Sequence, residues 1–171
     1  MLLNVALLTV IIFLLLLLSM VWPPDSPWAP WWRTNKKIAR AACELAKIGP
    51  KDVVYELGCG DATFLIMAAK EFGARGVGIE IDPLRVFISR FRVRYAGVSD
   101  KVKIIKGNFF DQDISGATVI FVYLVPKALV RLLPKFKKEL APGTKIVSYR
   151  YEMNLQLLHD DKKDGIRLYK V

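Results

Sequence analysis

The sequence of 171 residues has little of the chemistry that metal sites and disulfides need. It contains one histidine, His159, and two cysteines, Cys43 and Cys59, which do not form a CxxC pair. Structural zinc sites use four such ligands, so no metal site is expected. Cys43 falls in an expected helix and Cys59 in an expected turn, so a disulfide is not expected either. This thiol usage is typical of a cytosolic protein.

The first 32 residues lack basic side chains, and Asp25 is their only charged residue. The rest of the chain holds 26 basic and 15 acidic residues and so carries a charge of +11, which Asp25 reduces to the net charge of +10. A surface of this sign favours anionic partners such as lipid headgroups, nucleic acid or an acidic protein. A basic, solvated surface with no dedicated partner explains it equally well.

The segment from Met1 to Val21 is apolar and uncharged, which predicts a transmembrane helix. Its length suits the ~20 residues that a spanning helix needs. A cleavable signal peptide would need a basic start and a small-residue cleavage site, and neither is evident. We therefore expect an uncleaved anchor over residues 1–22. Because the first basic residues follow the span from Arg33, the predicted localisation is a single-pass membrane protein with its folded domain in the cytoplasm.

The chain after the expected anchor divides into a linker and one folded domain. Residues 23–32 are rich in proline and tryptophan, and their four prolines exclude a helix interior. This linker is short enough to keep the domain, residues 33–171, close to the membrane. The earlier tryptophans suit a membrane interface, whereas Trp31 and Trp32 could instead form the wall of a pocket.

Strand and helix patterns alternate along residues 33–171, which predicts an α/β fold with a Rossmann-like, doubly wound and mostly parallel sheet. The expected strands are 53–57, 75–81, 102–106, 117–124 and 145–151, and the expected helices are 35–48, 62–72 and 83–96, followed by two short helices after Pro126 that are separated at Pro134. Thr34 and Asp82 are the expected N-caps. Two tail strands, 154–159 and 166–171, predict an antiparallel hairpin at the sheet edge.

The first strand leads into Gly58-Cys59-Gly60-Asp61, a tight turn that faces a ligand in many α/β proteins. Gly58 and Gly60 lack the Cβ atoms that would keep a bound molecule away from the backbone, and the next helix can direct its N-terminal amides at that molecule. The dinucleotide fingerprint requires a third glycine, but Thr63 occupies that position. A dinucleotide is therefore disfavoured.

Acidic residues around the turn indicate a cationic ligand. Glu56 and Asp61 would repel a pyrophosphate but suit the ammonium and sulfonium groups of S-adenosylmethionine. Glu80 ends the second strand, where an acid can accept hydrogen bonds from both ribose hydroxyls, unless it is simply a solvent-exposed strand end. Asn108 can hydrogen-bond an adenine edge, and Phe109 can cover the adenine face. The predicted cofactor is S-adenosylmethionine.

Four motifs, in this order and spacing, carry a family resemblance: ELGCGD at 56–61, GIEIDP at 78–83, KGNFF at 106–110 and LAPGTKIVS at 140–148. They resemble the class I S-adenosylmethionine-dependent methyltransferases. More narrowly, they look like small archaeal protein lysine methyltransferases and the mitochondrial enzymes that methylate lysines of the ATP synthase c-ring protein and the adenine nucleotide translocase. Residues 29–34 are similar to the family's proline-aromatic-threonine lead-in, which lies over the cofactor.

The resemblance covers about Pro30 to Val171 and implies a role for each matching residue. It places Gly58 and Gly60 beside the methionine part with Glu56 and Asp61 near it, Glu80 at the ribose, Asn108 and Phe109 around the adenine, and Thr34 over the closed site. Tyr123, at the end of the fourth strand, is in the position of the usual substrate-facing motif. It could orient an acceptor amine, with Trp31 or Trp32 as a cation-binding wall, although ordinary packing explains these residues equally well.

These observations predict a membrane-anchored protein-lysine N-methyltransferase whose partner is a protein that presents lysine. The expected anchor favours a membrane-associated partner. The segment Tyr123-Leu124-Val125-Pro126 lacks the Asn/Asp-Pro-Pro-Tyr motif of many nucleic-acid base methyltransferases, so nucleic acid is not the expected partner. Two alternatives remain open: a methyltransferase of a small molecule, lipid or RNA, and a non-catalytic module that only binds S-adenosylmethionine.

Overall fold

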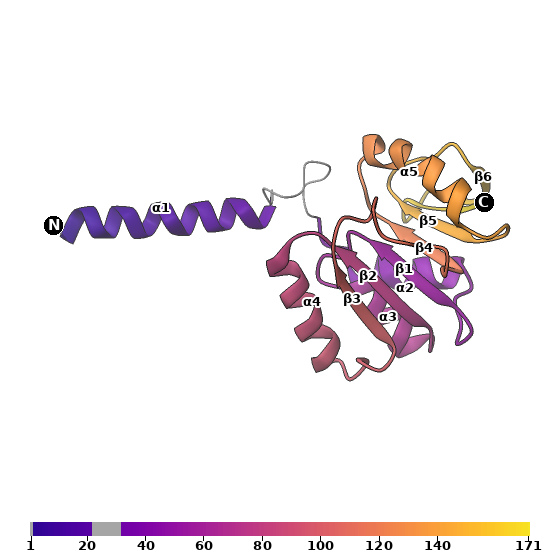
Figure 1. Ribbon diagram of the computed structural model, residues 1–171, viewed down its shortest axis with the longest axis horizontal. Helices are drawn as coiled ribbons and strands as arrows, with labels where there is room; N and C mark the ends of the chain where they lie inside the picture. Colours follow the sequence, from indigo (N-terminus) through magenta and orange to yellow (C-terminus); the bar gives the residue numbers. More distant parts are fainter. Residues whose placement is uncertain (1, 22–31) are drawn as a thin grey trace.

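The computed structural model describes residues 2–21 and 32–171, and its centre is a seven-stranded sheet in the order β3-β2-β1-β4-β5-β7-β6 (Figure 1). The strands are β1 (Val53–Leu57), β2 (Arg75–Glu80), β3 (Val102–Lys106), β4 (Val119–Val122), β5 (Lys145–Tyr149), β6 (Gln156–Asp161) and β7 (Ile166–Lys170). The first five are parallel, while β7 runs antiparallel to β5 and β6 antiparallel to β7. The α/β sheet and its edge hairpin are thus present as predicted.

Helices cover both faces of this sheet. One buried cluster joins side chains of α2 (Lys36–Leu45), α3 (Thr63–Glu71) and α4 (Pro83–Tyr95) to one face. The other joins α5 (Pro126–Glu139) to the opposite face. All four residues of β4 are buried, as a central parallel strand between two helical layers requires. This doubly wound arrangement brings the carboxyl ends of β1 to β5 to one edge, where ligands bind in such folds.

The start of α2 differs from the sequence prediction by one residue. Asn35, not Thr34, is the N-cap, because its side-chain Oδ1 accepts a hydrogen bond of 2.8 Å from the Ile38 amide. Thr34 is instead buried, with 7% of its surface exposed. Sequence preference alone does not separate two adjacent N-cap residues.

The prediction of two short helices after Pro126 is wrong, because α5 continues through Pro134 as one helix. Pro134 is exposed to solvent, so water can bond the carbonyl group that loses its helical partner. The opposite face of α5 buries Ala128, Leu129, Leu132 and Phe136. Packing of this apolar face holds the two halves of the helix in line.

The first helix, α1 (Leu2–Val21), lies where the anchor is predicted, but the structure does not support a membrane span. Within residues 2–21 and 32–171, no helix is long and apolar enough to cross a bilayer. The predicted transmembrane anchor and single-pass membrane localisation are therefore wrong.

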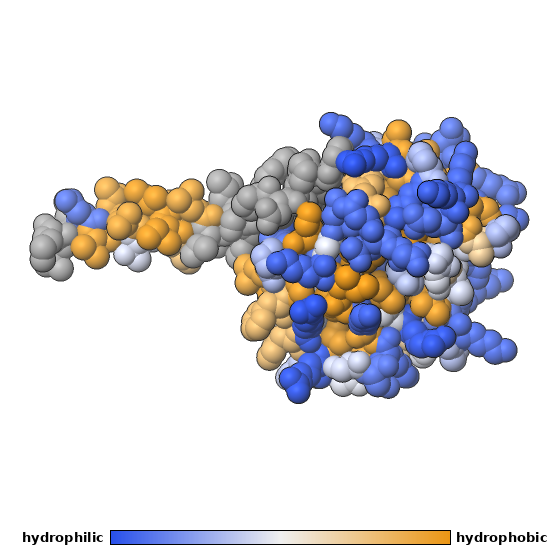
Figure 2. Space-filling view, viewed as in Figure 1, coloured by the Kyte–Doolittle hydropathy of each residue, from blue (hydrophilic) through white to orange (hydrophobic). Residues whose placement is uncertain are grey.

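Two further predictions depend on the segment before the domain. The expected membrane-associated partner rested on the same anchor and loses its support with it. The predicted linker, residues 23–32, lies outside the described residues apart from Trp32. Figure 2 shows apolar side chains along α1 and mostly hydrophilic side chains on the visible face of the domain.

Candidate cofactor and acceptor site

The glycine turn follows β1 at the point where the sheet order reverses, between β1 and β4. Gly58 and Gly60 have φ of +77° and +53°, a left-handed conformation that glycine adopts at little cost. The amides of Gly58 and Cys59 donate to the Ile79 carbonyl at 2.9 and 3.1 Å, which fixes the turn against β2. The predicted tight turn is therefore present. Gly58 and Gly60, the two positions expected to lie against a ligand, carry no side chain.

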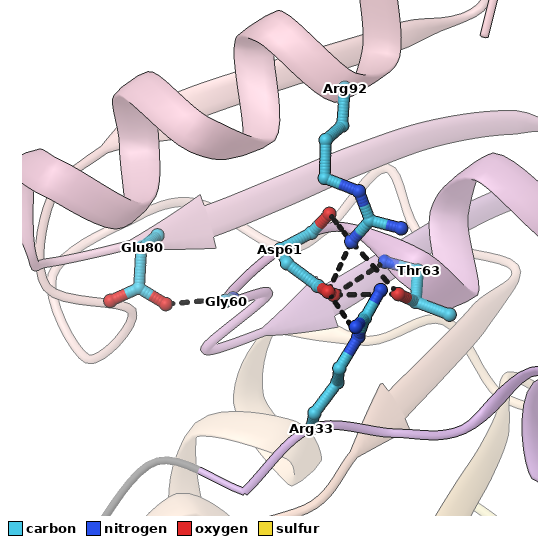
Figure 3. A network of polar contacts seen from close by, with 6 residues as sticks. All are labelled: Arg33, Gly60, Asp61, Thr63, Glu80 and Arg92. Atoms are coloured by element: carbon cyan, nitrogen blue, oxygen red, sulfur yellow. Dashed lines mark hydrogen bonds and ion pairs between the residues drawn. The ribbon is translucent and has the colours of Figure 1, made fainter. Parts of the chain in front are cut away.

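Glu80 joins the end of β2 to this turn (Figure 3). One carboxylate oxygen, Oε2, accepts a 2.8 Å hydrogen bond from the Gly60 amide, and the other, Oε1, accepts one of 3.0 Å from the Asp82 amide. Only 6% of Glu80 is exposed, so the alternative of a solvent-exposed strand end is wrong. Each carboxylate oxygen has a further lone pair, which leaves acceptors for ribose hydroxyls. The ribose contact itself stays a prediction.

Asp61 lies at the centre of a network of charged groups (Figure 3). Its Oδ1 accepts hydrogen bonds from the backbone amide and hydroxyl of Thr63 at 3.1 and 2.7 Å. Its Oδ2 forms ion pairs with Arg33, at 2.6 Å to Nε, and with Arg92. Arg92 also donates to the Asp61 carbonyl at 2.8 Å. Two guanidinium groups thus compensate the carboxylate of Asp61, whose negative charge was predicted to favour a cationic ligand.

Sequence reasoning missed both arginines of this network. Arg92 is one of four arginines on α4, and only folding brings this one against the glycine turn. Arg33 directly precedes Thr34, and its ion pair with Asp61 holds this segment beside the turn. The buried position of Thr34 agrees with a segment that packs over the site. The contacts of Asp61 and Thr34 with a cofactor stay predictions.

Glu56 is buried at the end of β1, and its Oε2 has no hydrogen-bond partner within the described part of the chain. Burial raises the pKa of this carboxyl well above its ordinary value, and the charges of Asp61 and Glu80 raise it further. A buried polar atom without a partner costs free energy. A ligand that brings a donor or positive charge to this carboxyl would remove that cost, so the residue fits the amine-bearing end of S-adenosylmethionine.

The third strand brings Asn108 and Phe109 to the same edge. The Gly107 amide donates to the Glu80 carbonyl at 2.9 Å, which places the following residues beside the end of β2. Asn108 accepts a 3.1 Å hydrogen bond from the Phe110 amide through Oδ1, and the rings of Phe109 and Phe110 lie 4.6 Å apart. Both predicted adenine contacts are half-buried, as side chains that face a ligand would be.

Tyr123 follows β4, and the structure pairs it with Tyr149, a residue that sequence reasoning missed. Their ring centroids are 4.6 Å apart in an edge-on arrangement. The signal that could have indicated Tyr149 is its position in the second half of the fifth predicted strand, 145–151, which was expected to run parallel to the strand that carries Tyr123. Trp32 is 66% exposed, and Trp31 lies outside the described residues, so a cation-binding wall of tryptophan stays a prediction.

Both cysteines are free and buried, which predicts thiols of low reactivity. Burial raises the pKa of Cys43 to about 12 and that of Cys59 well above its ordinary value, and the charge of Glu56 adds to both. Since the thiolate is the reactive form, we expect no reaction of the native protein with a chromogenic disulfide reagent at about pH 8. Denaturant should release both thiols, and rapid labelling of the native protein would contradict this prediction.

The fold and the site together define a methyltransferase of the doubly wound α/β type. The chain belongs to the family described as the ANTKMT methyltransferase domain, which matches residues 56–156. This confirms the predicted resemblance and the prediction of an enzyme. Within the described residues, no group of three or more His, Cys, Asp or Glu side chains could hold a metal ion.

Two named relatives are lysine methyltransferases. The chain is 41% identical over 128 residues to a protein-lysine N-methyltransferase of Saccharolobus islandicus (strain REY15A), and the match covers 74% of this chain and 80% of that protein. It is 29% identical over 99 residues to a lysine N-methyltransferase of Xenopus laevis that is named for the C-type subunit of ATP synthase, covering 58% of this chain. The match spans 43% of that Xenopus protein, less than half of its length.

A solved structure also resembles the whole domain. It is described as an RNA methyltransferase from Salinibacter ruber in complex with S-adenosyl-L-homocysteine. The two chains are 39% identical, with a TM-score of 0.78, over 81% of this chain and 92% of the Salinibacter chain. The acceptors named for these relatives therefore differ, whereas methyl transfer is common to them.

Proposed function

We propose that this protein transfers methyl groups from S-adenosylmethionine to lysine side chains of proteins. The observation that carries the choice of acceptor is the 41% identity to an archaeal protein-lysine N-methyltransferase over four-fifths of that protein's length. The Tyr123–Tyr149 pair supports it, because aromatic rings bind alkylammonium groups. The cofactor is S-adenosylmethionine, which fits the glycine turn and the unpartnered carboxyl of Glu56.

Each part of the site has a task in this reaction. Glu80 and Asn108 would hold the nucleoside, and Gly58 and Gly60 would let the methionine part approach the backbone. S-adenosylmethionine supplies a methyl group activated by its sulfonium centre. The lysine nitrogen forms a bond to that carbon as the bond to sulfur breaks, and the ammonium product releases its proton to solvent. The protein therefore has to align and desolvate a neutral amine rather than supply a strong base.

The aromatic pair helps with the protonation state as well as with position. A lysine that leaves water for an apolar site loses its proton more readily, because desolvation lowers its pKa. Burial raises the pKa of Tyr123 itself, so its phenol stays neutral at physiological pH. A neutral phenol can hydrogen-bond the amine without adding charge. Tyr123 is thus proposed to orient the acceptor.

RNA is the second candidate acceptor, because the Salinibacter structure of 39% identity is described as an RNA methyltransferase. Methyl-labelled S-adenosylmethionine, the purified protein and a cell extract separate the two. After the reaction, the extract is divided into protein, RNA and lipid fractions, and peptide mass spectrometry locates the methyl groups. We expect label in protein at lysine, and none with Glu80→Ala, while Glu71→Ala serves as the matched acidic control. Label in RNA or lipid alone would overturn the proposal.

A further inference from the structure

A positive charge already lies over the Tyr123–Tyr149 pair. The guanidinium carbon of Arg150 is 5.7 Å from the centroid of the Tyr123 ring and 5.5 Å from that of Tyr149. Both distances are within the ~6 Å over which a cation is attracted to an aromatic face. A hydrogen bond to Tyr149 and the two aromatic neighbours raise the pKa of Arg150 above its ordinary value. The pair therefore binds a cation of the protein itself.

The pair lies at the carboxyl edge of the sheet, the edge at which the cofactor is proposed to bind. Val122 and Ser148 are partners in the β4–β5 register, so Tyr123 and Tyr149 leave the sheet side by side at its carboxyl edge. The next residue, Leu124, approaches the glycine turn, with its Cδ2 only 3.5 Å from the position of a Cβ on Gly58. The two rings therefore lie at the same carboxyl edge of the sheet as the glycine turn that is proposed to hold the methionine part of the cofactor.

The backbone of Arg150 is fixed, while its side chain is exposed. Its φ of +70° is left-handed, which is uncommon for a residue with a side chain. The Arg150 amide donates to the Gly165 carbonyl at 2.8 Å, and its carbonyl accepts a 3.0 Å hydrogen bond from Arg167. Since β7 and the turn before it hold the backbone, the guanidinium can leave the rings by side-chain rotation alone.

We infer that Tyr123 and Tyr149 form the binding site for the ammonium head and alkyl stem of the acceptor lysine, and that Arg150 occupies this site until a substrate displaces it. The inference rests on the proposed function and extends it to Tyr149 and Arg150. Each acceptor must compete with an internal cation of the same charge. A lysine that also binds elsewhere on the protein competes better than a free amine, so Arg150 acts as a specificity-determining residue.

The decisive variant is Arg150→Gln, which removes the cation and keeps a side chain of similar shape. One contact of this kind changes an equilibrium about two- to fivefold. With a lysine-containing acceptor protein, we expect Arg150→Gln to lower KM about two- to fivefold and to leave kcat unchanged. Arg150→Lys should stay close to the wild type, and Tyr149→Leu should raise KM, whereas Tyr149→Phe keeps the ring. Arg75 is exposed at the amino end of β2, away from the carboxyl edge of the sheet, so Arg75→Gln controls for the lost charge.

A binding measurement without turnover distinguishes this inference from the proposed function. n-Butyltrimethylammonium, which resembles a methylated lysine side chain, is titrated into the full chain while the ring signals of the tyrosines are followed by NMR. We expect binding that is about two- to fivefold tighter in Arg150→Gln and lost in Tyr149→Leu. Equal affinity in the wild type and in Arg150→Gln would overturn the inference even if lysine methylation is found. Absence of lysine methylation would overturn the proposed function, while the titration still tests the site.

Discussion

Replacing Glu80 with alanine should weaken the binding of S-adenosylmethionine about 100-fold, as measured by isothermal titration calorimetry. The substitution removes the carboxylate that accepts hydrogen bonds from the buried Gly60 amide and the partly buried Asp82 amide. The substitution also removes the predicted contact of Glu80 with the ribose hydroxyls. A hydrogen bond to a charged group contributes about 1.5–3 kcal/mol, and about 2.7 kcal/mol corresponds to 100-fold in affinity.

Two variants sharpen this test. Glu71→Ala removes an acid near the end of α3 that pairs with Arg40, so it should leave cofactor binding unchanged. Glu80→Gln keeps the shape but turns one acceptor into a donor that faces a backbone amide, and it should give an intermediate loss. Circular dichroism confirms that each variant is folded. A change of less than about threefold in Glu80→Ala would show that this carboxylate does not hold the cofactor.

Replacing Gly78 with alanine should lower the free energy of unfolding by about 1–3 kcal/mol, the usual cost of an extra methyl group in a packed core. A Cβ at Gly78 would lie 2.7 Å from Cys59 Sγ, 2.7 Å from Leu65 Cδ1 and 2.8 Å from Ile104 Cδ1. Three neighbours would have to move at once. Since Cys59 belongs to the glycine turn, we expect weaker cofactor binding together with a melting temperature lower by several degrees.

Gly49→Ala is the matched control, because a Cβ there has no atom within 4 Å and the backbone is not left-handed. Thermal unfolding of both variants, followed by circular dichroism, measures the difference. Equal melting temperatures would mean that Leu65 and Ile104 rearrange without cost. In that case the close approach of β2 to the turn would not explain the glycine at this position.

Sequence patterns were most informative where the decisive contacts are local. β1 and β3 have the predicted bounds, and Asp82 caps α4 as predicted, with its Oδ1 2.8 Å from the Arg85 amide. Alternating or continuous apolar residues and N-cap chemistry act within a few positions of the chain. The tight turn at Gly58 and Gly60 is a local feature of the same kind.

Two features differ from the sequence prediction because they depend on contacts between residues that are far apart in the chain. Pro134 stays inside α5 because the opposite face of that helix is buried against the sheet. The charge expected of Asp61 is compensated by Arg33 and Arg92, which lie 28 and 31 residues away in the chain. Neither of these two outcomes is encoded within a single short segment. The predicted membrane anchor is an error of another kind, because no helix within the described residues is long and apolar enough to cross a bilayer.

The sequence by itself determined the order of strands and helices, the glycine turn and the family to which the chain belongs, because these depend on periodicity and on motifs of a few residues. Only the tertiary structure decided which side chains meet at the carboxyl edge of the sheet. Parallel strands end at the same edge however far apart they are in the chain, so Tyr123 meets Tyr149 and Gly60 meets Glu80. The proposed chemistry depends on these two contacts, because one pairs the tyrosine rings and the other holds the buried Glu80 carboxylate against the glycine turn.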